Sequence, residues 1–442
     1  MKKLLLLLFI IVSQTLFASK ADSLALKKNQ WVKIDSIEID GNEITEDYII
    51  LRELTFSPGD SINTQILNYN KERIYSLGIF NFVSVYASKK EDKNVVIISV
   101  SESWYFYPLP FLVIKNSDID KSTYGMIFLW KNFRGRNEII DLKFGLGFDP
   151  FISLSYYNPI VLESANLSLR YKFIHTTASN KSQLAEKKYG ESYDNTMYST
   201  ELMIGKRFDL YNTVFTEFGF DYIKTPKYVK GRITASDRSI DRVPRLSLLY
   251  QYDSRDLIQA PRNGRLAMLS LTHKGFNLDG INYNKLYLDY REYRELTDQV
   301  STKWRIAGRH MFGKVIPFYD NSYFGFDEYI RGHRTDEREG HNYLISSFEV
   351  RYPIVDEWNL KLNLPLLPRR LTSTRIRVLL TGFFDAGLTF NNNEPVFEQN
   401  KIDKGWGLGL TVMFLPHNAY RLEYAFDEYM NGEIIFGTGF SF

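Results

Sequence analysis

Charged side chains recur at every second position in two segments near the carboxyl end of this chain. Glu349 and Arg351 share one phase in the first segment, and Arg375, Arg377 and Asp385 share one phase in the second. The residues between them are mostly apolar. A period of two places these charges on one face of a strand and the apolar side chains on the other. If that face encloses a narrow space, each charge needs an ionic partner, because an unpaired charge there is costly.

A candidate partner lies in the polar connection that precedes these segments, within residues 311–342. There the sequence reads Tyr-Ile-Arg-Gly-His and contains Arg331, Gly332 and His333. A guanidinium is a rigid fork of donors that suits a carboxylate. The chemistry indicated is ion pairing inside the protein.

Signals for catalysis or metal binding are weak. The six histidines form no helical pair of ligands, and no nucleophile elbow is present. One loop holds several residues of metal-ligating types, but a polar loop explains them better; they are His333, Asp336, Glu337, Glu339 and His341. The acidic residues between Asp253 and Asp256 favour a hydrogen-bonded turn over a calcium site. We therefore expect no catalytic residue, no cofactor and no metal.

The elements that must position these charges are short strands in which apolar residues alternate with polar residues or glycine. Residues 105–442 contain about 16 such segments, an even number of suitable length for tilted membrane strands. The last one ends at the aromatic Phe442. Alternation of apolar residues with glycine or charge predicts an all-β transmembrane barrel with lipid outside and water inside. The longest polar connections then lie on the extracellular side of the membrane. Residues 353–374 are expected to form a structured excursion, a long folded connection, on the periplasmic side.

The amino terminus indicates export. Lys2 and Lys3 precede a short apolar run, and small residues follow, so residues 1–21 read as a secretory signal peptide. The chain has no cysteine, which excludes disulfides and thiolate metal sites. Its 55 basic and 52 acidic residues nearly cancel, so bulk charge implies no nucleic-acid partner. We expect the outer membrane of a diderm bacterium as the destination.

Residues 30–103 have a different pattern. A first strand is followed by a helix that Thr45 should cap, a second helix over Thr64 to Ser76, and two further strands. This order predicts a small α+β domain of type β-α-α-β-β that precedes the barrel.

That domain resembles a POTRA domain, the periplasmic module of outer-membrane assembly and secretion proteins. The resemblance depends on a short series of segments in order: Gly41-Asn42, Pro58-Gly59-Asp60, Leu77-Gly78-Ile79-Phe80 and Val100-Ser101-Glu102. It implies that an exposed strand edge pairs with an extended client segment. We expect that edge at Phe82, Val83 and Val85.

The barrel resembles the BamA and TamA superfamily. The segments that carry the resemblance are Arg331-Gly332, Phe383-Phe384-Asp385-Ala386-Gly387, Phe348 to Pro353, Asn132 to Arg136 and Tyr252 to Asp256. It implies that the loop around 311–342 enters the lumen and that Arg331 meets Asp385 on the barrel wall, near Glu349. His333 departs from the family, which prefers Phe or Tyr there.

The resemblance implies an outer-membrane insertase or translocase. Its partners would be unfolded client proteins, the lipid bilayer and other components of an assembly machinery, with no nucleic acid. Clients would pair at the edge of the POTRA-like domain and at a seam where the last barrel strand meets the first. The last strand contains Gly437, Gly439, Phe440 and Phe442. The alternatives are a passive pore or surface receptor, and a two-partner-secretion translocase for one dedicated substrate.

Overall fold

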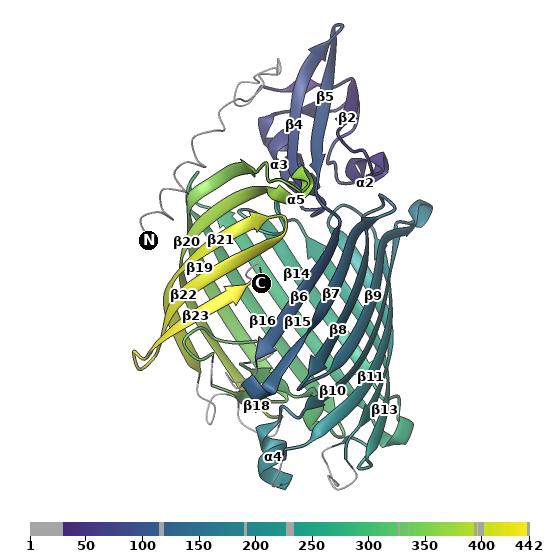
Figure 1. The fold of residues 1–442 in the computed structure, drawn as a ribbon, viewed down its shortest axis with the longest axis vertical. Helices are drawn as coiled ribbons and strands as arrows, with labels where there is room; N and C mark the ends of the chain where they lie inside the picture. The colour runs from purple at the N-terminus through teal and green to yellow at the C-terminus, as the bar shows by residue number, and fades with distance from the viewer. Residues whose placement is uncertain are drawn as a thin grey trace.

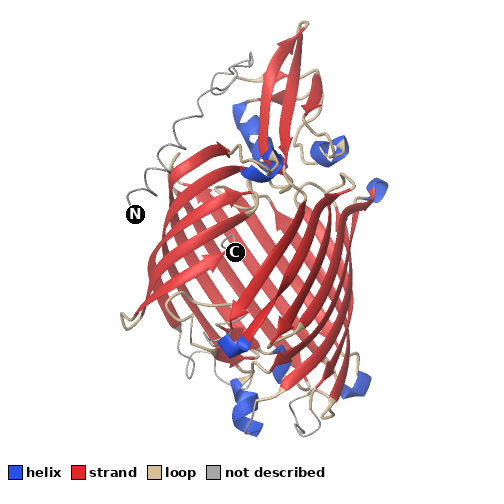
Figure 2. Cartoon of the chain, viewed as in Figure 1, coloured by secondary structure: helices blue, strands red, loops and turns tan. Residues whose placement is uncertain are grey.

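A computed structural model describes residues 30–114, 119–189, 192–226, 234–325, 328–334, 336–392, 396 and 402–439. The expected signal peptide, Phe440 and Phe442 lie outside these residues. The described chain has two parts: a small α+β domain and a large antiparallel sheet curved into a barrel (Figures 1 and 2). None of the helices in the described ranges is both long and apolar enough to cross a membrane.

The N-terminal domain is a three-stranded sheet with two helices. Its strands are ordered β2-β5-β4, with β5 in the centre, parallel to β2 and antiparallel to β4. A two-residue ladder joins β1 to β3. The elements are β1 (Val32–Lys33), β2 (Ser36–Asp40), α2 (Asp47–Leu51), β3 (Ser61–Ile62), α3 (Thr64–Tyr75), β4 (Phe80–Lys90) and β5 (Lys93–Glu102).

The predicted capping role of Thr45 is wrong. Helix α2 begins after Glu46 without a side-chain cap. Instead the Thr45 hydroxyl and amide donate to Glu102 Oε1 at 2.8 and 2.7 Å, which joins the loop to the end of β5. The second helix is capped by Asn63, whose side chain accepts from the Ile66 amide.

The barrel is a 16-stranded antiparallel sheet, as the alternation predicted, and each predicted strand segment corresponds to one strand. The strands are β6 (Phe106–Ile114), β7 (Ser122–Phe133), β8 (Glu138–Gly147), β9 (Phe151–Leu162), β10 (Leu167–Ser179), β11 (Asp194–Arg207), β12 (Asn212–Lys224), β13 (Ile240–Asp253), β14 (Gly264–Lys274), β15 (Tyr283–Glu295), β16 (Ser301–Gly313), β19 (Asn342–Lys361), β20 (Ser373–Phe390), β21 (Asp403–Leu415), β22 (Asn418–Asp427) and β23 (Gly432–Thr438). Two short strands, β17 (Ser322–Phe324) and β18 (Arg338–Gly340), pair within the longest loop. Helix α4 (Gln183–Tyr189) lies between β10 and β11.

The excursion expected over 353–374 is mostly a prolonged hairpin. Strands β19 and β20 continue their ladder to the pair Lys361 and Ser373, with register shifts after Pro353 and Val355. Only residues 362–372 connect them, including the short helix α5 (Arg369–Thr372).

The two end strands of the large sheet are β6 and β23. Within the described residues no ladder joins them, so the sheet is curved but not closed by backbone pairing. At the end nearer the N-terminal domain, β6 instead meets the turn between β21 and β22, where the Tyr107 hydroxyl lies 3.5 Å from His417 Nδ1. Within the described residues β6 and β23 therefore each present an unpaired sheet edge, at the place where the sequence predicts the seam.

The N-terminal domain rests on the barrel opening through one continuous apolar core. Its buried isoleucines share a cluster with Leu257 and Ala260 of a barrel turn and with Met413 and Leu415 of β21. Ser76, just after α3, receives a hydrogen bond of 2.9 Å from the Ile258 amide. Helix α3 thus lies against the barrel opening (Figure 1).

Candidate functional site: the loop inside the barrel

The connection between β16 and β19 enters the barrel. Ile330 is 1% exposed and packs with Phe324, Ala307, Tyr343 and Ile345, so the segment before Arg331 is held by apolar contacts with two barrel strands. This packing delivers Arg331 to the interior, where its own exposure is 1%.

Arg331 forms a bidentate ion pair with Asp385 of β20. Its Nε lies 2.6 Å from Asp385 Oδ2 and its Nη2 lies 2.7 Å from Oδ1. Nη1 donates to Glu349 Oε1 and to Glu423 Oε1, each at 3.0 Å. The guanidinium carbon lies 3.8 Å from the ring centre of Phe383, within the range of a cation–π contact. One buried cation therefore meets three carboxylates from β19, β20 and β22.

Two further bases complete the cluster. Arg351 donates to Glu349 Oε2 at 2.6 and 2.9 Å, and Lys303 Nζ lies 3.6 Å from Glu349 Oε1. Ser347 donates to Asp385 Oδ1 at 2.6 Å. We call this group the lumen cage, defined by Arg331, Lys303, Arg351, Asp385, Glu349 and Glu423. Its three bases match its three acids, so the cage has no net formal charge.

Glycines let the loop backbone approach the barrel wall. Gly332 has a φ of +98°, a conformation that disfavours other residues. A Cβ added at Gly405 of β21 would lie 1.6 Å from the carbonyl oxygen of Arg331. The loop can occupy this position only because the wall has no side chain there.

His333 lies at the loop exit, between acidic groups. Its Nδ1 is 2.8 Å from Asp336 Oδ2 and its Nε2 is 2.6 Å from Glu428 Oε2. Burial lowers the pKa of His333, but the hydrogen bonds to both carboxylates outweigh this and raise the pKa above its ordinary value. Ligand atoms of His333, Asp403 and Glu428 lie within 4.8 Å of one another, a spacing that could accommodate a divalent cation. In the structure Asp403 is ion-paired with Arg338.

The next residue, Arg334, reaches the open edge of the barrel. Its amide donates to Glu433 Oε2 at 3.2 Å, and its guanidinium donates to the backbone carbonyl of Phe436 in β23 at 3.1 Å. The loop therefore contacts the last strand directly. Gly437 lies in β23, and Gly439 follows it with a φ of +89° and donates its amide to the Ala419 carbonyl at 2.8 Å.

The other expected pairing surface is strand β4 of the N-terminal domain. It is an edge of its sheet, and Phe82, Val83 and Val85 lie on it. Val83 is 6% exposed and belongs to the core, whereas the Phe82 ring lies 5.0 Å from Lys361 Nζ of the β19–β20 hairpin. One end of this edge thus lies next to the barrel rim.

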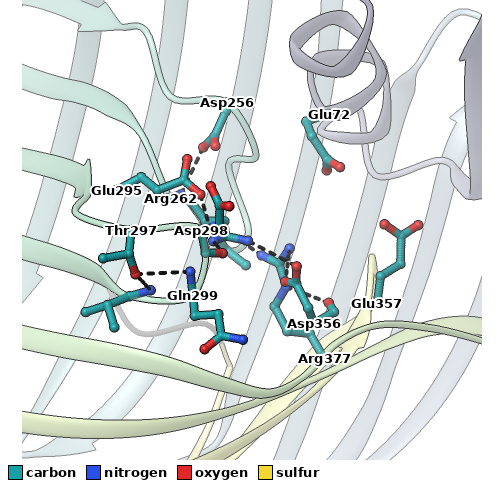
Figure 3. A network of polar contacts seen from close by, with 12 residues as sticks. Glu72, Asp256, Arg262, Glu295, Thr297, Asp298, Gln299, Asp356, Glu357 and Arg377 are labelled. Atoms are coloured by element: carbon teal, nitrogen blue, oxygen red, sulfur yellow. Dashed lines mark hydrogen bonds and ion pairs between the residues drawn. The ribbon is translucent and has the colours of Figure 1, made fainter. Parts of the chain in front are cut away.

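Several ion pairs that position the N-terminal domain escaped the sequence analysis. Glu72 of α3 accepts two hydrogen bonds from Arg375 at 2.9 and 3.0 Å, and Glu53 accepts from Arg207 at 2.7 Å. Burial raises the pKa of Glu72, but Arg375 outweighs it and holds the pKa below its ordinary value. Around Glu72 the barrel opening carries a wider polar network in which Asp356 bridges Arg262 and Arg377 (Figure 3).

Two other segments singled out in the sequence form turns at this opening. Arg255 binds the Asp253 carboxylate in bidentate fashion at 2.9 and 2.7 Å, and Asp256 accepts from the Leu257 and Arg262 amides. The turn containing Gly135 accepts a hydrogen bond from the Glu46 amide at 2.9 Å. Both segments fasten the N-terminal domain to the barrel.

The fold and site define an outer-membrane β-barrel with an internal loop and an N-terminal domain at its opening. Residues 132–442 match the model of the Omp85 superfamily domain, and residues 32–103 match that of the POTRA domain, described as surface antigen variable number repeat. This chain belongs to the Omp85 superfamily. It is an outer-membrane protein with a periplasmic POTRA domain, in a superfamily of insertases and translocases.

Solved structures share this architecture. BamA from Haemophilus ducreyi lacking POTRA domains 1–3 is 18% identical, with a TM-score of 0.52; the match covers 92% of this chain and 84% of that one. CdiB from Escherichia coli is 10% identical, with a TM-score of 0.57; the match covers 92% of this chain and 75% of that one. At these identities the likeness concerns the fold.

Proposed function

We propose that this protein inserts or translocates client proteins at the outer membrane by pairing their strands with its open sheet edges. An unpaired strand offers a row of backbone donors and acceptors, and an extended client segment can satisfy them without nucleotide or metal. The two edges are β4 of the POTRA domain and the seam between β6 and β23.

The observation that carries the proposal is the set of contacts between the internal loop and the seam. Arg331 holds the loop in the lumen through Asp385, Glu349 and Glu423, while Arg334 bonds to the Phe436 carbonyl on the free edge. A passive pore does not need a loop that is anchored by buried ion pairs and also bonded to an unpaired strand. The arrangement supports a seam whose availability depends on the loop.

The test is to fasten the seam covalently. The chain lacks cysteine, so Leu112→Cys in β6 and Phe436→Cys in β23 place one thiol on each side of the seam, and bifunctional thiol reagents of increasing length are used to join them. The matched control joins Tyr124→Cys to Leu146→Cys, which are already partners in the β7–β8 ladder. Proteoliposomes containing each protein are given an unfolded barrel client, and folding is followed by its heat-modifiable mobility on gels.

We expect the seam linkage to abolish client folding, and reduction of a cleavable linker to restore it, while the control linkage leaves folding unchanged. Client folding that is equally fast with the seam fastened would refute the proposal. Depletion in cells gives the second readout: selective loss of barrel proteins supports insertion, loss of one exported protein supports translocation, and an unchanged outer-membrane proteome excludes both.

A further inference from the structure

The tip of the β19–β20 hairpin carries a group of exposed apolar side chains. Leu366 is fully exposed, and Leu364, Leu367, Leu371 and Trp358 are 46, 47, 39 and 43% exposed. Monomeric proteins rarely leave so many large apolar residues exposed on one short segment, and such groups mark interaction sites.

The charged residues of the tip are all basic. Residues 359–374 contain no acidic residue, but they include Lys361, Arg369 and Arg370. The two acids just before the tip are directed elsewhere. Asp356 is paired with Arg262 and Arg377 (Figure 3), and Glu357 is paired with Lys71 at 3.1 Å. The hairpin is therefore amphipathic, with its acids in the polar network at the barrel opening and its leucines, Lys361 and Arg369 exposed beyond it, while Arg370 is ion-paired with Glu43 at 2.7 Å.

Exposed apolar residues of the lipid-facing barrel surface precede the tip along β19. In β19, Val350, Tyr352 and Ile354 are exposed, while Glu349 and Arg351, in the alternate phase, are buried in the lumen. Further along, Trp358 pairs across the ladder with Ile376, a residue in the outward phase of β20. Asp356 and Glu357 separate Ile354 from Trp358 and lie in the polar network at the barrel opening, so exposed apolar residues resume at Trp358 and in the tip.

Contacts of Arg370 fix the level of the tip relative to the membrane. Its backbone carbonyl accepts from the Trp104 amide at 3.2 Å, and Trp104 precedes β6 by two residues. Trp104 and Phe106 are themselves exposed aromatic residues, at 37 and 41%. Tryptophan and other aromatic side chains gather where a barrel passes from lipid to water. The tip therefore lies at the periplasmic boundary of the membrane, beside the first strand of the seam.

We propose that the hairpin tip, residues 358–371, is an interfacial anchor that inserts Trp358 and its leucines into the phospholipids of the periplasmic leaflet, next to the seam. Lys361 and Arg369 match anionic headgroups, and the leucines match the acyl region just beneath them. A lipid surface suits this combination better than a protein client does, because the tip is joined to Trp104 beside the exposed aromatic residues at the start of β6, where the barrel passes from lipid to water.

The absence of cysteine again allows a direct test in the full chain. Leu366→Cys is labelled with an environment-sensitive fluorophore, and the protein is reconstituted in phosphatidylethanolamine and phosphatidylglycerol vesicles with spin-labelled lipids as quenchers. The matched control is Leu296→Cys, an equally simple substitution of a leucine that is 61% exposed in the β15–β16 turn, beside Glu295 and Asp298. Heat-modifiable mobility verifies that both proteins are folded.

We expect a blue-shifted emission and strong quenching by shallow spin-labelled lipids at position 366, and neither at position 296. Quenching at 366 should fall when phosphatidylglycerol is replaced by a neutral lipid or when Arg369→Glu is added. Water-like emission at 366, equal quenching at both positions, or a shift that appears only when a client peptide is added would each overturn the proposal. The last outcome would assign the tip to protein binding.

Discussion

Removing the lumen arginine is the sharpest test of the cage. Arg331→Ala leaves Asp385 and Glu423 without their guanidinium, at exposures of 1 and 4%. The Asp385 carboxylate keeps two neutral donors, the Ser347 hydroxyl at 2.6 Å and the backbone amide of residue 331 at 3.3 Å. Glu349 keeps Arg351 and is less affected. The variant thus places about one uncompensated negative charge in a confined interior.

The expected cost follows from this imbalance. Breaking a buried ion pair by removing one partner costs about 3–5 kcal/mol, because the remaining charge stays desolvated. Asp385→Ala should cost a similar amount with the opposite sign of excess charge. The double variant restores neutrality, two bases against two acids, so its cost should fall below the sum of the single variants by about 0.5–3 kcal/mol.

The free energy of unfolding can be measured by guanidinium titration in detergent micelles, with heat-modifiable mobility as an independent readout. Arg294→Ala is the matched control, because this arginine is 66% exposed and pairs with Glu292 at 2.7 Å. Exposed pairs contribute about 0–1 kcal/mol, so the control should remain close to wild type. If the double variant simply adds the two single costs, or if Arg331→Ala behaves as the control does, the cage does not hold the loop.

Three further variants test other parts of the structure. Gly405→Ala should expel the loop and lower the free energy of unfolding by about 1–3 kcal/mol, because the new Cβ would collide with the Arg331 backbone. Gly382→Ala is the control and should unfold like wild type, because its Cβ would meet nothing closer than 3.7 Å. Glu72→Gln should loosen the POTRA domain at neutral pH, seen as faster amide exchange in α3. The pKa of Glu72 lies below its ordinary 4.5, so its contribution persists above that pH and is lost only in stronger acid; unchanged exchange at pH 7 would contradict this. Burial, and to a smaller extent the charge of Lys131, lowers the pKa of His417 from 6.5 to about 4. Because the unfolded state binds this proton more readily than the folded state, the protein should lose stability as the pH falls from 6.5 to 4. His417→Asn should flatten that dependence, and an equally steep loss in the variant would show that other groups cause it.

The barrel could be predicted from the sequence because the alternation of residues within one strand shows which face meets lipid and which meets the lumen. Each residue of β20 alternates between lipid and lumen, so the inward phase of Arg375, Arg377 and Asp385 could be inferred without knowing which strand lies beside which. All three are at most 5% exposed in the structure. The same alternation underestimated the lengths of β19 and β20, because beyond the membrane a ladder continues without any apolar period to mark it.

Contacts between distant segments were beyond such reasoning. Glu423 joins the cage from β22, 92 residues after Arg331, and Glu72 meets Arg375 across 303 residues. Glu423 alternates correctly for the lumen, so its inward phase was available as a signal. Nothing local distinguishes Glu72 from any solvated glutamate on a helix, since its burial arises only when α3 lies against the barrel opening.

The order of contacts along the loop suggests why its anchor is buried so deeply. Arg331 is enclosed by barrel strands, and three residues later Arg334 bonds to the edge of β23. In the function that we propose, a client strand that pairs with this edge would compete with Arg334 for the Phe436 carbonyl, since an exposed hydrogen bond of that kind is readily exchanged. The buried ion pairs at Arg331 resist the same exchange, because separating them leaves charge in a confined space. Under that proposal the loop would release the edge while Arg331 stays fixed, and Arg334 would cover the edge again once the client has left.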